Sequence, residues 1–558
     1  MEKNTLLAII ISAIIIIAYM VIQPILFPLP EAPIPETPVV TEDPVETKDL
    51  SVVNENHNIF EEEELKEENY ILTTNFVKII FTNKGGDIIS YELLEHKDKD
   101  GLIQMADNIS ENNRSFSVAF GDNYENINNV IFNTQVETDK IIFSKKLKNG
   151  GLISKTYSLK ENEYMFKLDI TVEGVDGGYT LRTSPQIGPH YNAKKDRYEY
   201  RRFLAYSNGK QKKKQLGNNA TEYFEKEFTW TGVAGKYFSI LVKPVRPQDF
   251  SKIAYSTAIE NNDYANAQVM LLRKTLAQKS VTDEYYIYIG PQKDKILSLY
   301  NKEADNIWGV SGFYLDDALS YSGILSWLEA ILKAILEFMH DKLKINWGIA
   351  IIIMTILLKI IMFPLTKKSS IATLKMQQIQ PQIQELQAKY KNNPEKLNLE
   401  TAKLYQEMGH NPLLSGCLPL LLQFPLIISM FNLFNNYFEF RGAKFIPGWI
   451  PDLSVGDSIM TLGFSLPILG NEIRLLPFIY VVFQLLYGKI TQSANNANAG
   501  QMKFMTYGMP LIFFFLFYNA PAGLLIYWTV SHILQLGQQI LINKMMKEKR
   551  EEMGLSQK

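Results

Sequence analysis

The chain has 558 residues, which corresponds to about three or four domains, and its formal net charge of −2 averages two opposite parts. Residues 31–346 contain 47 acidic and 38 basic residues, whereas residues 347–558 contain 18 basic and 11 acidic residues. This asymmetry and the strongly apolar second part exclude a single soluble domain, and the one cysteine, Cys417, excludes an intrachain disulfide and a four-cysteine zinc site.

The first predicted element is a membrane anchor. Residues 4–30 carry no charge, and residues 6–27 are almost wholly apolar. These 22 residues would extend about 33 Å as a helix, which is enough to cross a hydrocarbon core of about 30 Å. A cleaved signal peptide is the alternative, but its apolar region is usually shorter, about 7–15 residues. The pattern therefore favours an uncleaved transmembrane anchor over residues 1–27.

Residues 28–69 form the next predicted segment, an extended linker. They combine six prolines with the acidic run Glu61–Glu64 and contain too little apolar sequence to fold. From residue 70 to residue 318 the pattern changes to short runs in which apolar and polar residues alternate, separated by glycine and asparagine clusters. Alternation of period two with such turns predicts an all-β antiparallel sandwich over residues 70–318.

A few side chains of this β-domain could be imagined as acid–base groups. They are His190 with Tyr191 and Asp196, and the pair Glu222 and Glu225. No metal-ligand spacing, nucleophile motif or phosphate-binding loop accompanies them in the sequence. The sequence therefore favours a binding or spacing module and predicts no catalytic residues, no cofactor and no metal. An envelope protein acting on glycans through this domain is the alternative.

Residues 319–345 contain an amphipathic helix by their periodicity. Leu328, Ile331 and Ile335 fall on one face, and Glu329 and Lys333 fall on another. A helix of this kind just before a transmembrane span is expected to lie in the membrane interface. The alternative is a soluble helix that packs against the sandwich.

Five further apolar segments predict a transmembrane core within residues 346–543. The predicted spans are residues 346–366, 413–438, 474–491, 504–519 and 522–543. Between the first two, residues 367–412 have helical periodicity on both sides of a turn and predict a helical hairpin. Basic residues concentrate in this hairpin and in the short tail 544–558, so both termini are expected in the cytoplasm and residues 28–345 outside it.

Lys359 is the one charged residue of the predicted span 346–366. A charge at the middle of a span costs about 2.5–3.5 kcal/mol on insertion scales and usually marks function. The alternative is snorkelling, because Lys359 lies roughly 12 Å from the cytoplasmic boundary and its long stem recovers part of that distance. Polar residues in other spans, such as Gln423, Gln484 and Gln535, must pair or line a wet cavity, and they favour a functional role.

Four groups of motifs follow one another between residues 320 and 545. They are Asn346-Trp347-Gly348 with Met362-Phe363-Pro364-Leu365-Thr366-Lys367, Gln380-Pro381-Gln382-Ile383-Gln384, Asn411-Pro412-Leu413 with Gly416-Cys417-Leu418-Pro419-Leu420, and Pro521-Ala522-Gly523-Leu524 with Ile526-Tyr527-Trp528. These motifs resemble those of the YidC-type membrane protein insertases, in the same order. The anchor and the large β-domain are similar to the Gram-negative form of this family. The resemblance thus implies a multi-pass protein of the cell inner membrane, with residues 28–345 in the periplasm.

The resemblance also implies the architecture of the core, namely five transmembrane helices around a hydrophilic groove open to cytoplasm and lipid. The family carries an arginine in that groove where this sequence has Lys359, so the positive charge is kept but the planar, bidentate fork is lost. The groove residues expected on this basis are Lys359, Thr355, Gln423, Gln484, Tyr527, Trp528, Thr529, Ser531 and Gln535.

The function implied by the resemblance is insertion and folding assistance of client membrane proteins, with no enzymatic activity. The expected partners are nascent or newly made membrane proteins, the Sec translocon, the translating ribosome and the phospholipid bilayer. The ribosome would not be bound through a long basic tail, because residues 544–558 form only a short one. Direct sequence-specific binding of nucleic acid is not expected. A membrane channel or transporter is the alternative from another class, although the sequence shows none of the inverted halves typical of transporters.

Overall fold

The computed structural model describes Phe60 and residues 65–552, apart from gaps at 99–100, 121–126, 128, 176, 193–195, 197, 277–278, 320–324, 392, 408–417, 467–468 and 492–506. The predicted anchor 1–27, most of the linker 28–69, Cys417 and the end of the tail 544–558 lie outside the described residues. The chain forms two compact units, one ending at Leu319 and the other beginning at Ser320.

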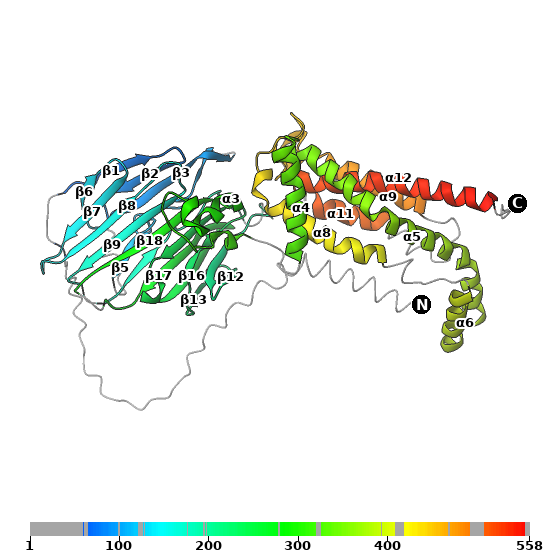
Figure 1. Cartoon of the computed structure of the whole chain (residues 1–558), viewed down its shortest axis with the longest axis horizontal. Coiled ribbons are helices and arrows are strands. Elements are labelled where there is room, and N and C mark those ends of the chain that lie inside the picture. Colours follow the sequence, from blue (N-terminus) through cyan, green and yellow to red (C-terminus); the bar gives the residue numbers. More distant parts are fainter. Residues whose placement is uncertain are drawn as a thin grey trace, which may run out of the picture. The chain divides into compact units, whose positions relative to one another are not determined.

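The first unit is built from three antiparallel sheets (Figure 1). The largest has nine strands in the order β12 (Lys210–Lys214), β11 (Arg202–Ser207), β14 (Trp230–Ala234), β15 (Phe238–Pro244), β18 (Ser280–Pro291), β9 (Met165–Glu173), β8 (Leu152–Ser158), β7 (Lys140–Lys146) and β6 (Asn133–Val136). A five-stranded sheet has the order β13 (Thr221–Phe224), β16 (Phe250–Glu260), β17 (Asp263–Arg273), β10 (Tyr179–Arg182) and β5 (Val118–Phe120). A four-stranded sheet has the order β1 (Asn69–Thr73), β2 (Val77–Thr82), β3 (Asp87–Asp98) and β4 (Gly101–Gln104).

The core of this unit lies between the large sheet and the two smaller ones. Alternate residues of β9, including Leu168 and Ile170, are fully buried, as expected of a strand with one face in the core. The four-stranded sheet contacts this face through Phe81, whose ring centroid is 5.0 Å from that of Tyr157 on β8. The five-stranded sheet contributes Phe250, 5.9 Å from Tyr285 on β18. The prediction of an antiparallel β-domain is therefore confirmed, although short helical turns such as α3 (Asp294–Leu297) follow its last strand.

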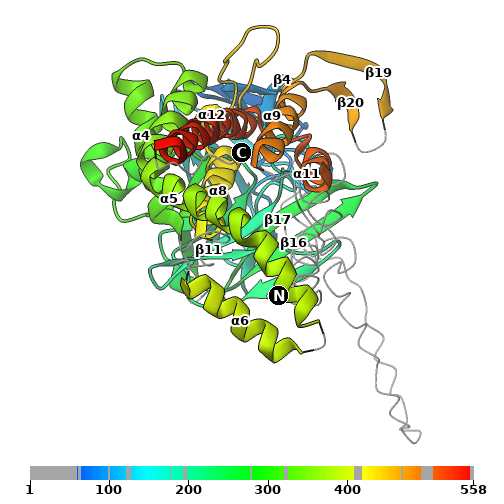
Figure 2. The same cartoon turned by 90° about the vertical axis from the view of Figure 1, so that its right-hand side faces the viewer.

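The second unit is mainly helical, as predicted for the core (Figure 2). Its main elements are α4 (Ser326–Glu337), α5 (Trp347–Lys389), α6 (Pro394–Glu407), α8 (Leu418–Asn436), β19 (Met460–Leu466), β20 (Gly470–Ile473), α9 (Leu476–Thr491), α11 (Met509–Phe517) and α12 (Ala522–Glu552). Helix α12 packs against α5, α8 and α9, so it is the central helix of the described bundle. Its residues Leu524 and Leu525 are fully buried at these contacts.

The start of α5 is fixed by side-chain hydrogen bonds of Asn346. Its Oδ1 accepts a bond from the Gly348 amide at 2.8 Å, which caps the helix, and its Nδ2 donates to the Lys444 carbonyl at 2.7 Å. A Cβ at Gly348 would lie 2.2 Å from the Phe445 ring, so only glycine permits this close approach. These contacts explain why asparagine and glycine occupy positions 346 and 348 of the Asn346-Trp347-Gly348 motif.

Helix α5 continues well beyond residue 366, where the apolar pattern places the end of a span. It runs unbroken for 43 residues and includes Pro364 and Pro381, so the span and the first helix of the predicted hairpin are one element. The second helix of that hairpin is α6. Among the described residues, Trp347–Ile371 is the one helical segment long and apolar enough to cross a membrane, and Leu476–Ile490 is apolar but shorter.

The amphipathic helix α4 buries a different face from the one suggested by its polar periodicity. Glu329 is buried, together with Leu332 and Leu336, whereas Ile331 is 49% exposed and Phe338, just beyond the helix, is 58% exposed. Glu329, which the sequence places on the polar face of the helix, therefore lies on the buried side of α4. The physical reason is a polar partner on the neighbouring helix, since Asn432 Nδ2 of α8 donates a hydrogen bond to Glu329 Oε2 at 2.8 Å.

The segment between α8 and α9 is held to the starts of α9 and α12 by a network around Asp457 and Arg474. Asp457 Oδ2 accepts bonds from the Leu475 and Leu476 amides at 2.7 and 3.0 Å, and so caps α9. Arg474 donates to Asn519 Oδ1 at 3.0 Å and to the Asp457 carbonyl at 2.8 Å. The segment is therefore attached firmly at this end of the bundle.

Candidate functional site

A stripe of side chains on α5 forms one wall of a cavity in the helical unit. Thr355, Lys359, Met362, Thr366 and Ser369 all line it, and they follow one another at intervals of four, three, four and three residues. Residues at these intervals lie on one face of a helix. Leu358 and Leu365, which flank the stripe, complete this wall. The wall is therefore mixed, with hydroxyls and an amine set among apolar side chains.

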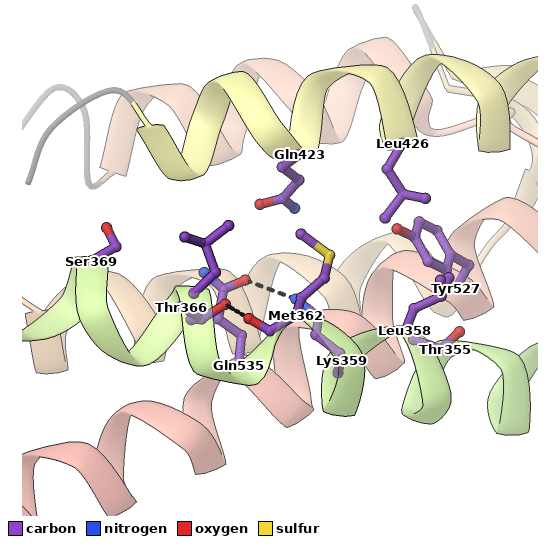
Figure 3. A pocket seen from close by; sticks show the side chains of 11 residues that line it. Thr355, Leu358, Lys359, Met362, Thr366, Ser369, Gln423, Leu426, Tyr527 and Gln535 are labelled. Carbon is purple, nitrogen blue, oxygen red and sulfur yellow. Dashed lines mark hydrogen bonds between the residues drawn. The ribbon is translucent and has the colours of Figure 1, made fainter. Parts of the chain in front are cut away.

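The opposite walls come from α8 and α12. Helix α8 contributes Gln423 and Leu426, and α12 contributes Tyr527 and Gln535. In Figure 3, Gln423 points from α8 across the cavity toward α5, and Lys359 of α5 lies beside Gln535 of α12. The empty volume is about 620 Å³, including the part open to the outside. We call this space, with its eleven lining residues, the polar cavity.

Lys359 is half-buried and contacts α12 at two points. Its Nζ donates a hydrogen bond to Gln535 Oε1 at 3.5 Å, and its backbone carbonyl accepts one from Gln538 Nε2 at 3.2 Å. No lining residue of the polar cavity is acidic, and Lys359 forms no ion pair with any residue that the structure describes. The ammonium group therefore has one neutral acceptor at the long limit of a hydrogen bond and retains donors for a guest.

The two threonine hydroxyls of the stripe are bonded to their own helix. Thr355 Oγ1 donates to the Ile351 carbonyl at 2.7 Å, and Thr366 Oγ1 donates to the Met362 carbonyl at 3.1 Å. The Gln423 amide, in contrast, makes no hydrogen bond to any described residue. A hydrophilic guest would thus find the Lys359 ammonium and the Gln423 amide as the groups most available for hydrogen bonds.

Five of the nine predicted groove residues line the polar cavity, and four lie elsewhere in the bundle. The five are Thr355, Lys359, Gln423, Tyr527 and Gln535. Gln484 lies on α9, and Trp528, Thr529 and Ser531 are buried residues of α12. The Trp528 ring packs between Phe517 at 4.6 Å and Tyr480 at 6.0 Å.

The polar atoms of two of these four residues lack partners in the described part of the chain. Gln484 Oε1 and Thr529 Oγ1 are buried and accept or donate no hydrogen bond to a described residue, and His532 Nδ1 is in the same situation. Buried polar atoms of this kind are usually satisfied by water or by another chain. The face between α9 and α12 therefore also has unused hydrogen-bonding capacity.

Sequence reasoning missed several residues of the cavity wall. Met362, Thr366 and Ser369 line it on α5, together with Leu358, Leu365 and Leu426. The signal that could have found the first three is the spacing from Lys359, since positions three, seven and ten residues farther along a helix share its face. Leu426 carries no comparable signal, because its placement depends on how α8 packs against α5.

Three of the acid–base candidates of the β-domain form polar contacts with neighbouring residues. His190 Nδ1 lies 3.7 Å from Asp107 Oδ2 and is 62% exposed, and Glu222 forms an ion pair with Lys214 at 2.5 Å. Asp196 accepts a hydrogen bond from the Asn192 amide. No cluster of three metal-ligating side chains occurs among the residues that the structure describes.

Comparisons with known proteins match both units of the chain. The family model described as "60Kd inner membrane protein" matches residues 338–550, and the one described as "YidC periplasmic domain" matches residues 70–335. The membrane protein insertase YidC of Treponema denticola is 42% identical over 98% of this chain and 100% of its own length. That of Treponema pallidum is 38% identical over 87% of this chain and 86% of its own. A crystal structure of an active YidC insertase is 19% identical, with a TM-score of 0.35 over 85% of this chain and 92% of that chain.

Proposed function

Because the chain belongs to the YidC family of membrane protein insertases, we propose that its polar cavity receives the hydrophilic segment of a client protein during insertion. The family consists of inner-membrane proteins with a periplasmic domain, so the β-domain is periplasmic. Insertion of client membrane proteins is thus the function, in place of a channel, a transporter or a glycan-active envelope protein.

The observation that carries the proposal is the amine of Lys359 in a cavity without acidic residues. Moving a polar segment from water into hydrocarbon costs several kcal/mol for each unsatisfied group. The polar cavity lowers that cost, because it offers hydrogen bonds and room for water inside the bundle. Lys359 in addition attracts carboxylates of the client segment, and this attraction is stronger in a partly desolvated site than in bulk water.

The membrane topology that supports this mechanism has six spans with both termini in the cytoplasm. Helices α5, α8, α9, α11 and α12 would provide five spans, and residues 1–27 would provide the anchor. Basic residues of α6 and of the end of α12 would then lie on the cytoplasmic side, as the positive-inside rule favours. The Sec translocon and the translating ribosome are proposed partners, because clients leave both in an unfolded state.

In this mechanism no nucleotide and no catalytic step is required. The hydrophilic segment enters the polar cavity from the cytoplasm, and the apolar helix that follows it moves into lipid. Burial of that helix supplies the free energy, at about 25 cal/mol for each Å² of apolar surface removed from water. The insertase lowers the activation free energy of this transfer, whereas the free energy of insertion depends on the sequence of the client.

Charge variants of Lys359 test the proposal. We expect Lys359→Arg to insert clients normally, Lys359→Ala to reduce insertion of clients with acidic segments by about fivefold, roughly 1 kcal/mol, and Lys359→Glu to reduce it further. The measurement is insertion of one client into proteoliposomes, with its translocated segment made acidic, neutral or basic.

The three client versions are the control for each variant. An equal loss for all three versions of the client would contradict electrostatic attraction and leave only a hydrating role for Lys359. Full activity of Lys359→Ala on every version would show that Lys359 merely snorkels to the interface, and the proposal would then be wrong.

A further inference from the structure

The β19–β20 hairpin presents an apolar surface beside α9. Val455, Ile459, Met460 and Phe464 are 51%, 47%, 52% and 64% exposed, respectively. Residues 458–471 contain no charged side chain. Figure 2 shows the two strands extending from the helical unit beside α9. An exposed group of large apolar side chains usually marks a contact surface.

The base of this hairpin is fixed to the bundle. The amide of Ile459 donates to the Ile473 carbonyl at 3.0 Å, and Tyr518, directly after α11, donates from its hydroxyl to the Glu472 carbonyl at 2.9 Å. The charges near the base are paired, since Arg474 lies 2.8 Å from Glu472 and its side chain is only 12% exposed. The hairpin therefore has a defined position relative to α9 and carries little uncompensated charge.

The length of α9 indicates how deep the hairpin lies. Its 16 residues rise about 24 Å, which is roughly 6 Å short of a hydrocarbon core of about 30 Å. Lys489, near the end of α9, is exposed and would mark the cytoplasmic boundary of the lipid. The other end of α9, where the hairpin is attached, then falls within the outer leaflet, below its headgroups.

We propose that the apolar surface of the β19–β20 hairpin inserts into the outer leaflet of the bilayer and contacts phospholipid acyl chains there. Helix α9, beside the hairpin, also exposes apolar side chains, since Phe478 and Val482 are 47% and 53% exposed. The hairpin would thus extend the hydrophobic length of a short span. The inference rests on the proposed topology, in which α9 spans the membrane.

The occupant is lipid because the surface adjoins a span and has no charged rim. A soluble partner protein would more often meet a polar rim around an apolar centre. At the base of the hairpin, Met460 pairs with Ile473 and Thr461 pairs with Glu472, and this pairing lowers the cost of placing these backbone groups beside acyl chains.

Fluorescence quenching in vesicles tests the proposal on the full chain. In a Cys417→Ser background, a polarity-sensitive label is placed at Phe464→Cys, at Phe478→Cys on α9 and at Lys444→Cys. Lys444 is an exposed charged residue of the same segment and serves as the aqueous control. The proteins are reconstituted into phosphatidylethanolamine–phosphatidylglycerol vesicles containing lipids with a spin label at a shallow or a deep acyl position. Retained insertion of a client shows that each variant is folded.

We expect shallow spin-labelled lipid to quench the Phe464 label at least about twofold more than the Lys444 label. Aqueous iodide should quench the Phe464 label less than the Lys444 label. If lipid quenches the Phe478 label but the Phe464 label is quenched strongly by iodide and not by lipid, the proposal is wrong. Protection from both quenchers would mean that protein, such as a second copy, covers the surface, and would also overturn it. If the Phe478 label is not quenched by lipid either, the proposed topology itself is wrong.

Discussion

Lys359 is the one charged side chain that lines the polar cavity, and its chemistry differs from that of an arginine. Its ammonium is a point charge with three donors on a flexible stem, and the structure gives it one long hydrogen bond, to Gln535. An arginine at this position could bind a carboxylate through two parallel bonds, whereas lysine can follow a moving carboxylate with less geometric restriction. We infer that Lys359 favours acidic client segments without selecting a particular orientation.

Glu163 of the β-domain gives a prediction about pH at the same scale. Its Oε2 accepts a hydrogen bond from the Tyr300 hydroxyl at 2.5 Å, and burial raises the pKa of this half-buried carboxyl. A raised pKa means that the folded state binds the proton more tightly than the unfolded chain. This contribution to stability is complete below the ordinary pKa of about 4.5 and is lost as the pH rises through the pKa of the folded state.

We therefore expect Glu163→Gln to raise the thermal stability of the β-domain at pH 7 and to have little effect near pH 4. The amide keeps an acceptor for Tyr300 and removes the charge. Thermal unfolding of the purified protein at both pH values measures this, with Glu303→Gln, an exposed site, as the control. Destabilisation by Glu163→Gln at pH 7 would show that the carboxylate is needed in its charged form.

At the scale of single elements, α4 is attached to α8 by two polar contacts rather than by apolar packing alone. Glu329 accepts from Asn432, and Glu337 Oε1 accepts from the Tyr437 hydroxyl, each at 2.8 Å. The apolar residues Trp327 and Ile331 are left 60% and 49% exposed. An outward apolar face with polar groups turned inward is the arrangement expected of a helix in contact with lipid.

A pair of substitutions at Glu329 tests this attachment. We expect Glu329→Gln to preserve stability, because the amide oxygen still accepts from Asn432. Glu329→Leu should cost about 1–3 kcal/mol, because it removes the acceptor of this partly buried hydrogen bond from Asn432 and the other polar contacts of the carboxylate. Thermal unfolding in detergent, with Ala330→Leu on the exposed side of α4 as the control, gives the comparison. A harmless Glu329→Leu would contradict the role of this hydrogen bond.

Helix α5 illustrates which element boundaries sequence can predict. The charges that begin at Lys367 suggested the end of a span, but charged residues do not interrupt an α-helix, and α5 continues to Lys389. Even the prolines at 364 and 381 are accommodated, although each removes one backbone hydrogen bond. Periodicity and charge therefore located the apolar part of α5, while the length of the helix depends on its packing and could not be read from them.

At the scale of the whole molecule, the sequence predicted the class of each unit better than its internal arrangement. Alternation revealed the β-domain, but strand β18 pairs with β9, more than a hundred residues away, and local patterns do not encode such pairing. The same holds for the buried ion pair of Asp87 with Lys155, at 2.5 Å. In the helical unit, Lys359 and Gln423 were found because polar residues in an apolar run are conspicuous.

The division into two units predicts which parts insertion requires. All lining residues of the polar cavity belong to the unit that begins at Ser320. We therefore expect deletion of residues 70–314 to leave insertion of simple clients largely intact, and deletion of residues 324–344, which include α4, to abolish it. Insertion in a strain depleted of its own insertase measures both. Loss of insertion without residues 70–314, at normal protein levels, would contradict this division.

The central claim, that client segments occupy the polar cavity, is tested most directly by site-specific photocrosslinking to ribosome-bound nascent chains. The reactive amino acid is placed at Met362, which lines the polar cavity, or at its neighbour Ile361, which is 74% exposed. We expect Met362 to crosslink to the hydrophilic segment of the client, and Ile361 to crosslink to lipid or to the client's apolar helix. If Met362 does not crosslink to the hydrophilic segment, or if Ile361 crosslinks to it equally strongly, client segments do not occupy the polar cavity as proposed.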